Sequence, residues 1–229
     1  ERPGAFVANI LGLELALMGM FTALNLLQFW LFALAEVIPA ALLIRRWGTS
    51  PVRDRAATQY VRAMLGGLTA LLAGILLLGW HHAATAGIWS FDLAALAETP
   101  VPAGQQSLIF VLLFGGLAVR LALFPFHAWL PIVAKHGTVA VGMVLLVGAK
   151  VGVYALLRFV LPLLPVAAQQ WDGWVVALGL VGMVYGALLA MLQVDLRRLL
   201  AFAVISQSGV LMAGLFSLNE SGLKGGLLL

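Results

Sequence analysis

Four ionisable residues, Glu14, Glu36, Arg120 and Lys150, lie near the middle of long apolar stretches of this 229-residue chain. A charge at the centre of a bilayer costs roughly 2.5–3.5 kcal/mol on insertion scales, so such groups are expected to face protein, water or one another. At 1.5 Å of rise per residue, each lies within about one turn of the middle of its predicted helix. The four residues therefore predict a row of charges at one membrane depth, as in a proton or cation relay. The alternative is a static buried ion pair that fixes helix packing.

The two cations of this row differ in chemistry. A buried lysine is readily neutralised by desolvation and recharged by a nearby carboxylate, so a Glu–Lys pair can act as a proton switch. An arginine guanidinium keeps its proton under nearly all conditions. We therefore expect Lys150 to carry protons and Arg120 to act as a fixed positive charge that biases its neighbours.

The segment FPFHAWLP lies between these two cations. Pro125 lacks an N–H group and is expected to break the helix, which frees backbone carbonyls that can bind a cation or water. His127 follows the break and could pass protons near neutral pH. Glu14, His127 and His136 are therefore further possible relay residues. An ordinary proline kink with a packed histidine is the alternative interpretation.

The composition indicates a membrane protein. Hydrophobic residues make up 63% of the chain and charged residues only 10%, against about 45–50% and 25% in soluble domains. A soluble enzyme, a secreted disulfide scaffold and a nucleic-acid binder are therefore excluded as classes. The absence of cysteine excludes thiolate-bound iron–sulfur clusters, and no metal-ligand spacing, phosphate loop or nucleophile–base set is present. We expect no cofactor and no metal in this chain. It begins at Glu1 with no signal peptide before the first span, and reads as a piece of a longer protein.

Apolar stretches of roughly 20 residues are long enough to cross a bilayer, and they predict an all-α polytopic membrane protein. We expect about seven transmembrane helices and the start of an eighth. The predicted spans cover about residues 6–24, 27–46, 60–80, 106–131, 138–163, 172–194 and 196–217.

The Lys and Arg residues predict the orientation of these spans, because cytoplasmic loops are enriched in them. One side receives nine of them: Arg2, Arg45, Arg46, Arg53, Arg55, Arg62, Lys135, Arg197 and Arg198. The other side receives Arg158 and Lys224. The N-terminus is therefore expected on the cytoplasmic side, or its organellar equivalent.

Five stretches carry a family resemblance: LNLLQFWLFALAEVIPAALLIRRWG, RAATQYV, LAVRLALFPFHAWLP, LLVGAKVGVYALLRF and DLRRLLAFAVISQSGVLMAGLFSLN. Together they resemble the proton-pumping, antiporter-like membrane subunits of respiratory complex I (NADH:quinone oxidoreductase), most of all the subunit M type, and their relatives in Mrp-type antiporters. The resemblance implies two inverted five-helix repeats, each with a broken helix, the first of them near Pro125. Residues 1–165 would form the first repeat and residues 166–229 the beginning of the second.

The resemblance also implies roles for the charged row. Glu36 matches the glutamate that partners a lysine, Arg120 occupies the place of that lysine on the broken helix, and Lys150 matches the central lysine that passes the proton along the membrane. The sequence departs from the family at Arg120, and also at Asn25 and Gln207, where an Asp and a His are common. IVAKHGT replaces the usual segment after WLP.

The leading hypothesis is a proton-translocating subunit of a complex I-type machine in a bacterial inner membrane or an energy-coupling organellar membrane. NADH, flavin, iron–sulfur clusters and quinone would then belong to partner subunits, and the chain's own partners would be other membrane subunits and the lipid bilayer, with no nucleic acid. A subunit of an Mrp-type Na⁺(K⁺)/H⁺ antiporter and a non-transporting membrane scaffold are the alternatives.

Overall fold

A computed structural model describes residues 3–138, 142, 148 and 150–227. The described residues form helices and connecting turns, with a single isolated bridge between Asn25 and Asp92 in place of any sheet. Among these residues, six helices are long and apolar enough to cross a membrane. The prediction of an all-α, multi-pass membrane protein is confirmed. The predicted fifth span, residues 138–163, lies partly outside the described residues.

The first three helices run antiparallel to their neighbours: α1 (Pro3–Thr22), α2 (Leu26–Trp47) and α3 (Arg53–Ala86). The side chain of Asn25 caps α2 by accepting hydrogen bonds from the backbone N–H groups of Leu27 and Gln28, which satisfies donors that the first helical turn leaves free.

Helix α3 is longer than the predicted span 60–80. It has no proline from Arg53, which follows Pro51 closely, to its last residue Ala86, and Gly87 ends the helix with φ of 78°. Arg62 therefore lies well inside the helix and not at its foot, where the predicted span placed it.

The predicted break near Pro125 is confirmed. After the short α4 (Leu93–Glu98), α5 (Ala103–Arg120) ends well before the proline, and the helix resumes as α6 (Trp129–His136). Arg120 is thus the last residue of α5, not a mid-helix residue of a span 106–131 as predicted. The indole of Trp129 donates to the carbonyl of Val119 at 2.9 Å, so an acceptor freed by the break is satisfied.

Residues 150–155 are helical and continue into the π-helical turn η1 (Leu156–Val160) and α8 (Leu161–Leu163). Helix α9 (Pro165–Met191) then begins seven residues earlier than predicted, because Pro165 fits the first helical position. It pairs with α10 (Leu196–Phe216), and α11 (Glu220–Leu227) forms the predicted start of a further helix.

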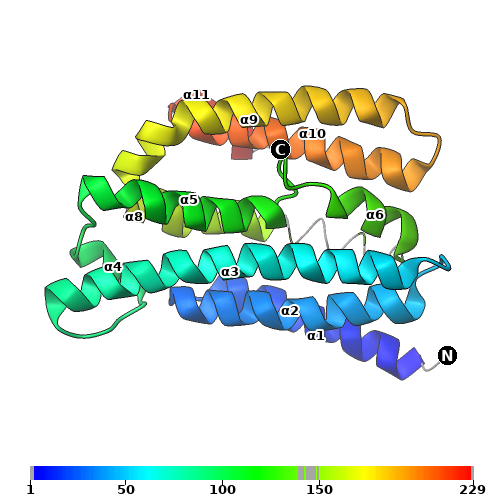
Figure 1. Ribbon diagram of the computed structural model, residues 1–229, viewed down its shortest axis with the longest axis horizontal. Coiled ribbons are helices and arrows are strands. Elements are labelled where there is room, and N and C mark those ends of the chain that lie inside the picture. The colour runs from blue at the N-terminus through cyan, green and yellow to red at the C-terminus, as the bar shows by residue number, and fades with distance from the viewer. Residues whose placement is uncertain (1–2, 139–141, 143–147, 149, 228–229) are drawn as a thin grey trace.

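The helices lie side by side along the long axis of the molecule, with α9 and α10 as one layer and α1 to α3 as another, on either side of α5 (Figure 1). Glycines allow the closest approaches. A Cβ added at Gly116 of α5 would come within 2.6 Å of the carbonyl oxygen of Gly67 on α3, and one at Gly209 of α10 within 2.4 Å of the carbonyl oxygen of Gly179 on α9. Small residues at these crossings therefore set the spacing of both layers.

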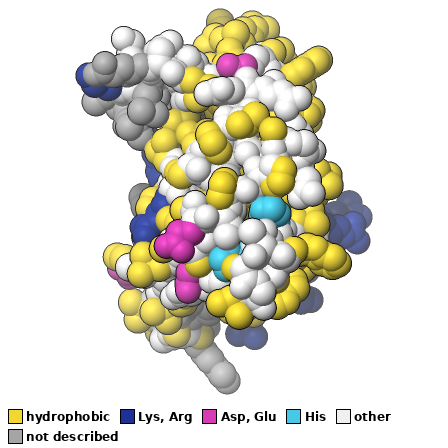
Figure 2. Space-filling model, turned by 90° about the vertical axis from the view of Figure 1, so that its left-hand side faces the viewer, with side chains coloured by type: hydrophobic (Ala, Val, Ile, Leu, Met, Phe, Trp, Pro, Cys, Tyr) yellow, Lys and Arg dark blue, Asp and Glu magenta, His cyan; other side chains and the backbone are white. Residues whose placement is uncertain are grey.

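The predicted segregation of basic loops is visible in the fold. The turns that follow α2, α6 and α9 meet at one end of the molecule (Figure 1). There the guanidinium of Arg197 donates to the carbonyl of Gly137 at 3.0 Å and to the hydroxyl of Thr49 at 3.3 Å, and Arg45 pairs with Asp54 at 3.0 Å. The opposite end, with α4, shows acidic and histidine side chains (Figure 2).

Candidate functional site

The centre of the candidate site is a buried ion pair between Glu36 and Arg120. Glu36 lies in the middle of α2 and is 2% exposed, and the side chain of Arg120 is 10% exposed. One guanidinium nitrogen contacts the Glu36 carboxylate, and Nε donates to the carbonyl oxygen of Gly148 at 3.2 Å. Two of the charges predicted to form a row are therefore brought together.

The break in the α5–α6 segment positions Arg120. Because α5 ends at this residue, the guanidinium lies at a helix C-terminus, where carbonyl groups without helical partners favour a cation. The contact of Gly116 with Gly67 holds α5 close to α3, and the indole of Trp30 on α2 donates to the carbonyl of Leu68 on α3 at 2.8 Å. Helix α3 thus aligns the acid-bearing and the arginine-bearing helices.

Tyr60 is a neighbour of the pair that the sequence analysis missed. It is 2% exposed, and its ring meets the ring of Trp129 edge-on, with centroids 5.6 Å apart. Tyr60 and Trp129 line, with Glu36 and Arg120, a cavity of about 10 Å³, which is about the space that one water molecule needs. The sequence does contain a signal for this position. Tyr60 has a polar hydroxyl and lies on the same face of α3 as Met64 and Gly67, at helical spacing.

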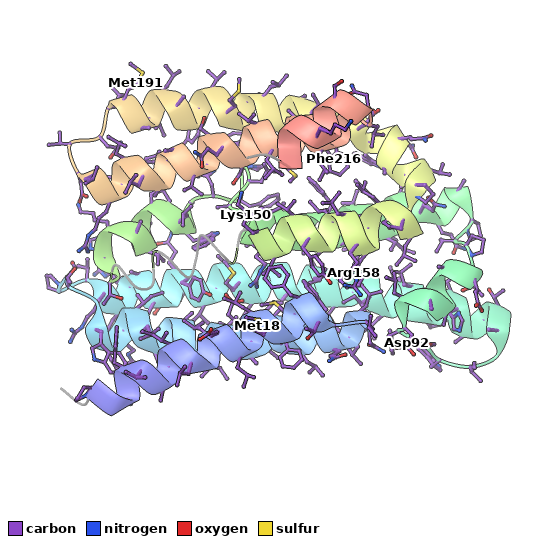
Figure 3. All side chains as sticks on the ribbon, turned by 180° about the vertical axis from the view of Figure 1, so that it is seen from behind. Met18, Asp92, Lys150, Arg158, Met191 and Phe216 are labelled. Atoms are coloured by element: carbon purple, nitrogen blue, oxygen red, sulfur yellow. The ribbon has the colours of Figure 1, made fainter. Side chains whose placement is uncertain are left out.

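Lys150 lies two residues beyond Gly148, whose carbonyl accepts the hydrogen bond from Arg120. Its side chain is exposed, unlike those of Glu36 and Arg120. Figure 3 shows Lys150 near the middle of the long axis, at the start of the helical segment that carries Arg158. Lys150 therefore lies near Gly148, the residue that contacts Arg120, but it is not itself buried with the Glu36–Arg120 pair.

Tyr154 and Arg158 continue the face of Lys150 at four-residue spacing. The Arg158 guanidinium donates to the Tyr154 hydroxyl and lies 5.3 Å from the centroid of that ring. The hydroxyl in turn donates to the carbonyl oxygen of Phe21 at 2.6 Å. Polar side chains thus follow Lys150 along its own helix, and the hydrogen bond from Tyr154 to Phe21 connects that helix to the end of α1.

Glu14 has a different position from the one expected of a relay residue. Gly12 and Gly19 of α1 pack against Pro39 and Phe32 of α2, and this register puts Glu14 at the depth of Glu36. Its side chain, however, is exposed on the outer face of α1. It shares the depth of the pair without contacting it.

His127 is buried at the break, where it stacks on Phe124 with ring centroids 5.6 Å apart. Its Nε2 lies 3.2 Å from the hydroxyl of Tyr185 on α9, and its Nδ1 has no hydrogen-bond partner among the described residues. The histidine is therefore tied to α9 and not to the ion pair.

His136 ends α6 at the basic end of the molecule, where its carbonyl accepts a hydrogen bond from the N–H group of Thr49 at 3.2 Å. Burial, and then the neighbouring Lys135, lower the pKa of His136, which favours the neutral ring. Its side chain is half-buried, and its Nδ1 has no hydrogen-bond partner among the described residues.

Within the described ranges, no group of three or more His, Cys, Asp or Glu residues is placed to hold a metal ion. The chemistry of the site is that of a buried carboxylate, a permanent cation, a tyrosine and an adjacent lysine. Such a set can hold and move protons.

Comparison with known proteins gives the family. Residues 23–229 match the family described as NADH:quinone oxidoreductase/Mrp antiporter, TM. The chain is 35% identical over 220 residues to NADH-ubiquinone oxidoreductase chain 4 of Metridium senile, covering 95% of this chain and 43% of that protein. It is 31% identical over 229 residues to NADH-quinone oxidoreductase subunit M of Escherichia coli K12, covering 97% and 45%.

Solved structures show the same fold. A chain in the structure of respiratory complex I from Thermus thermophilus with bound NADH matches with a TM-score of 0.87 at 33% identity, over 97% of this chain and 47% of that one. A chain of the archaeal membrane-bound sulfane sulfur reductase matches in fold, with a TM-score of 0.82 at 23% identity over 94% and 44%. This chain thus spans less than half the length of these relatives. It belongs to the transmembrane family of NADH:quinone oxidoreductase subunits and Mrp antiporters.

Proposed function

We propose that this chain is the antiporter-like part of a proton-translocating membrane subunit in a complex I-type NADH:quinone oxidoreductase. The observation that carries the proposal is the buried Glu36–Arg120 pair at the end of the broken helix. A buried ion pair is commonly no more stabilising than apolar side chains of similar volume, and ionisable residues inside membranes typically mark ion pathways. The family match and the names of the relatives support the same function.

In this proposal Arg120 is a fixed charge and Glu36 and Lys150 exchange protons. A proton arriving at Glu36 neutralises the carboxylate and weakens its attraction to Arg120. Arg120 remains charged and hydrogen-bonded to the Gly148 carbonyl. The resulting positive field at the Gly148–Lys150 segment favours release of a proton from Lys150, since a nearby like charge disfavours the ammonium form. Quinone reduction in partner subunits would drive this cycle.

The proposal extends to organisation and setting. Residues 1–165 would form the first inverted repeat and residues 166–229 the beginning of the second. The basic end that carries Arg45 and Arg197 would face the cytoplasm, or its organellar equivalent, as the positive-inside rule favours. The partners would be further membrane subunits, and NADH, flavin, iron–sulfur clusters and quinone would be bound by other subunits of the complex.

The test is proton translocation by the complete parent complex in vesicles, comparing the native protein with Lys150→Ala at a matched rate of electron transfer. Lys224→Ala is the matched control, because it removes a lysine outside the proposed row. We expect Lys150→Ala to abolish most of the translocation through this subunit while the complex stays assembled, and the control to pump normally. Full pumping by an assembled Lys150→Ala complex would support a non-transporting scaffold instead.

A second comparison isolates the role of Arg120. We expect Arg120→Lys to retain translocation, since it keeps a cation beside Glu36, and Arg120→Ala to lose it. Loss of pumping in an assembled Arg120→Lys complex would contradict the role of a fixed charge.

A further inference from the structure

The outer face between α2 and α3 carries a groove of about 790 Å³ that the proposed function does not use. Its walls are largely apolar and include Leu34, Ile38, Ala41, Val61 and Leu65. Two cations also line it: Arg45, which pairs with Asp54 at one end, and Arg62.

The contacts between α2 and α3 fix the depth of Arg62. The Arg45–Asp54 pair and the hydrogen bond from Trp30 to the Leu68 carbonyl set the register of these antiparallel helices. Both contacts place Arg62 opposite Glu36 and Val37. Arg62 therefore lies eight residues deeper than Asp54, or about 12 Å at 1.5 Å per residue.

Arg62 is exposed in the groove, at the depth of the buried pair. In the part of the chain that the structure describes, the ion pairs are Arg45–Asp54 and Glu36–Arg120, and Arg62 takes part in neither. An arginine facing lipid at this depth is costly, and such residues almost always face protein or water and pair with another group. We therefore expect an anion from outside the described residues to pair with Arg62 in the groove, at the level of Glu36.

We propose that the α2–α3 groove receives a transmembrane helix of a partner subunit, and that a carboxylate on this helix pairs with Arg62. The inference rests on the proposed membership of a membrane complex. The groove extends from the level of Leu34 to that of Arg45, eleven residues or about 16 Å of helix, so it can accept about three turns of a partner helix. A planar guanidinium suits bidentate pairing with a carboxylate.

A phospholipid fits these observations less well. Its phosphate lies at the interface, near Arg45 and Asp54. The side chain of Arg62 leans toward the N-terminus of α3, as helical side chains do, but starts about 12 Å below that level. The anion that meets Arg62 is therefore better supplied by a residue within the membrane than by a headgroup.

The test compares Arg62→Leu and Arg62→Lys in the full-length protein, with recovery in the membrane complex as the readout. A lipid-facing arginine would make Arg62→Leu neutral or favourable, because a costly charge is removed. If a partner carboxylate faces Arg62, the leucine leaves that acid unpaired. We expect Arg62→Leu to lower recovery in the complex about tenfold, which corresponds to 1.4 kcal/mol, and Arg62→Lys to retain most of it.

A photo-crosslinking residue at position 38, on the rim of the groove, identifies the occupant, and one at position 108, an exposed site on α5, is the control. We expect position 38 to yield a peptide from a membrane helix of another subunit, with an Asp or Glu near its middle. Exchanging that acid for Arg in the Arg62→Glu background should restore assembly.

Crosslinks to lipid alone or to another segment of the same chain, or normal assembly of Arg62→Leu, would overturn the proposal. A variant that assembles normally but pumps poorly would bear on the proposed function of the Glu36–Arg120 pair and not on the groove. The failure of one proposal can thus be distinguished from the failure of the other.

Discussion

Two regions of the molecule hold their helices together in different ways. Helices α9 and α10 pack through small residues, with Gly179 against Gly209, and no acidic or basic residue stands between Asp172 and Asp195. Helices α2 and α5 instead meet at a buried ion pair, Glu36–Arg120, beside a broken helix. Both arrangements are compact. The hydroxyl of Ser206 on α10 also donates to the carbonyl of Met183 on α9 at 2.9 Å. These two helices are thus joined without an ion pair, which supports the proposal that the charges of the other region serve a purpose beyond cohesion.

The largest effect is expected from breaking the pair on one side only. Glu36→Ala leaves the Arg120 guanidinium as an uncompensated charge in an apolar interior, which costs about 3–5 kcal/mol. We expect the free energy of unfolding in detergent to fall by this amount. Asp54→Ala is the control, since it breaks the exposed Arg45–Asp54 pair, for which a change of at most about 1 kcal/mol is expected. Equal losses in the two variants would mean that the Glu36 site is as well solvated as the surface.

A smaller loss is expected from overpacking the uncharged region. In Gly209→Leu the new side chain meets the backbone of α9 and forces α9 and α10 apart, which costs about 1–3 kcal/mol. Thermal unfolding measures the loss. Gly173→Ala on α9 is the control, because no atom lies within 4 Å of an added Cβ there. Wild-type stability of Gly209→Leu would show that this helix pair is not closely packed.

Replacing both members of the charged pair sharpens the comparison further. In Glu36→Leu/Arg120→Met no unpaired charge remains, and the free energy of unfolding should return to within about 1 kcal/mol of the native value or exceed it. Proton translocation by the parent complex should nevertheless be lost. A double variant as unstable as Glu36→Ala would indicate that the pair holds the helices together, and one that pumps normally would remove it from the pathway.

The smallest effect is expected at Glu14, which shares the depth of the pair but lies on the exposed face of α1. Glu14→Gln should change the free energy of unfolding by no more than about 0.5 kcal/mol, as for most surface substitutions. A loss of several kcal/mol would place Glu14 in the buried row after all.

The sequence predicts the helical class and the broken helix because both follow from local chemistry, namely long apolar stretches and a proline at position 125. It also identifies Glu36 and Arg120, since charges in apolar helices are conspicuous. It does not reveal that α5 ends at Arg120 and that Glu14 turns outward. The face that a side chain presents depends on the helix it packs against, and Tyr60 was missed because a tyrosine in an apolar helix is unremarkable until its neighbours are known.

The same limit applies to Arg62. By sequence it lies at the foot of the predicted span 60–80, close to the basic residues Arg53 and Arg55. Only the contacts between α2 and α3 place it opposite Glu36. The positions of individual charges in depth are thus set by helix register, which is a tertiary property.

The central claim is that the buried pair belongs to a proton pathway. The most direct measurement is the number of protons translocated per electron by the parent complex in vesicles, with native protein and with Glu36→Gln, which keeps the size of the side chain and removes its charge. We predict an assembled Glu36→Gln complex with electron transfer but with clearly fewer protons per electron. An unchanged ratio in that complex would contradict the account.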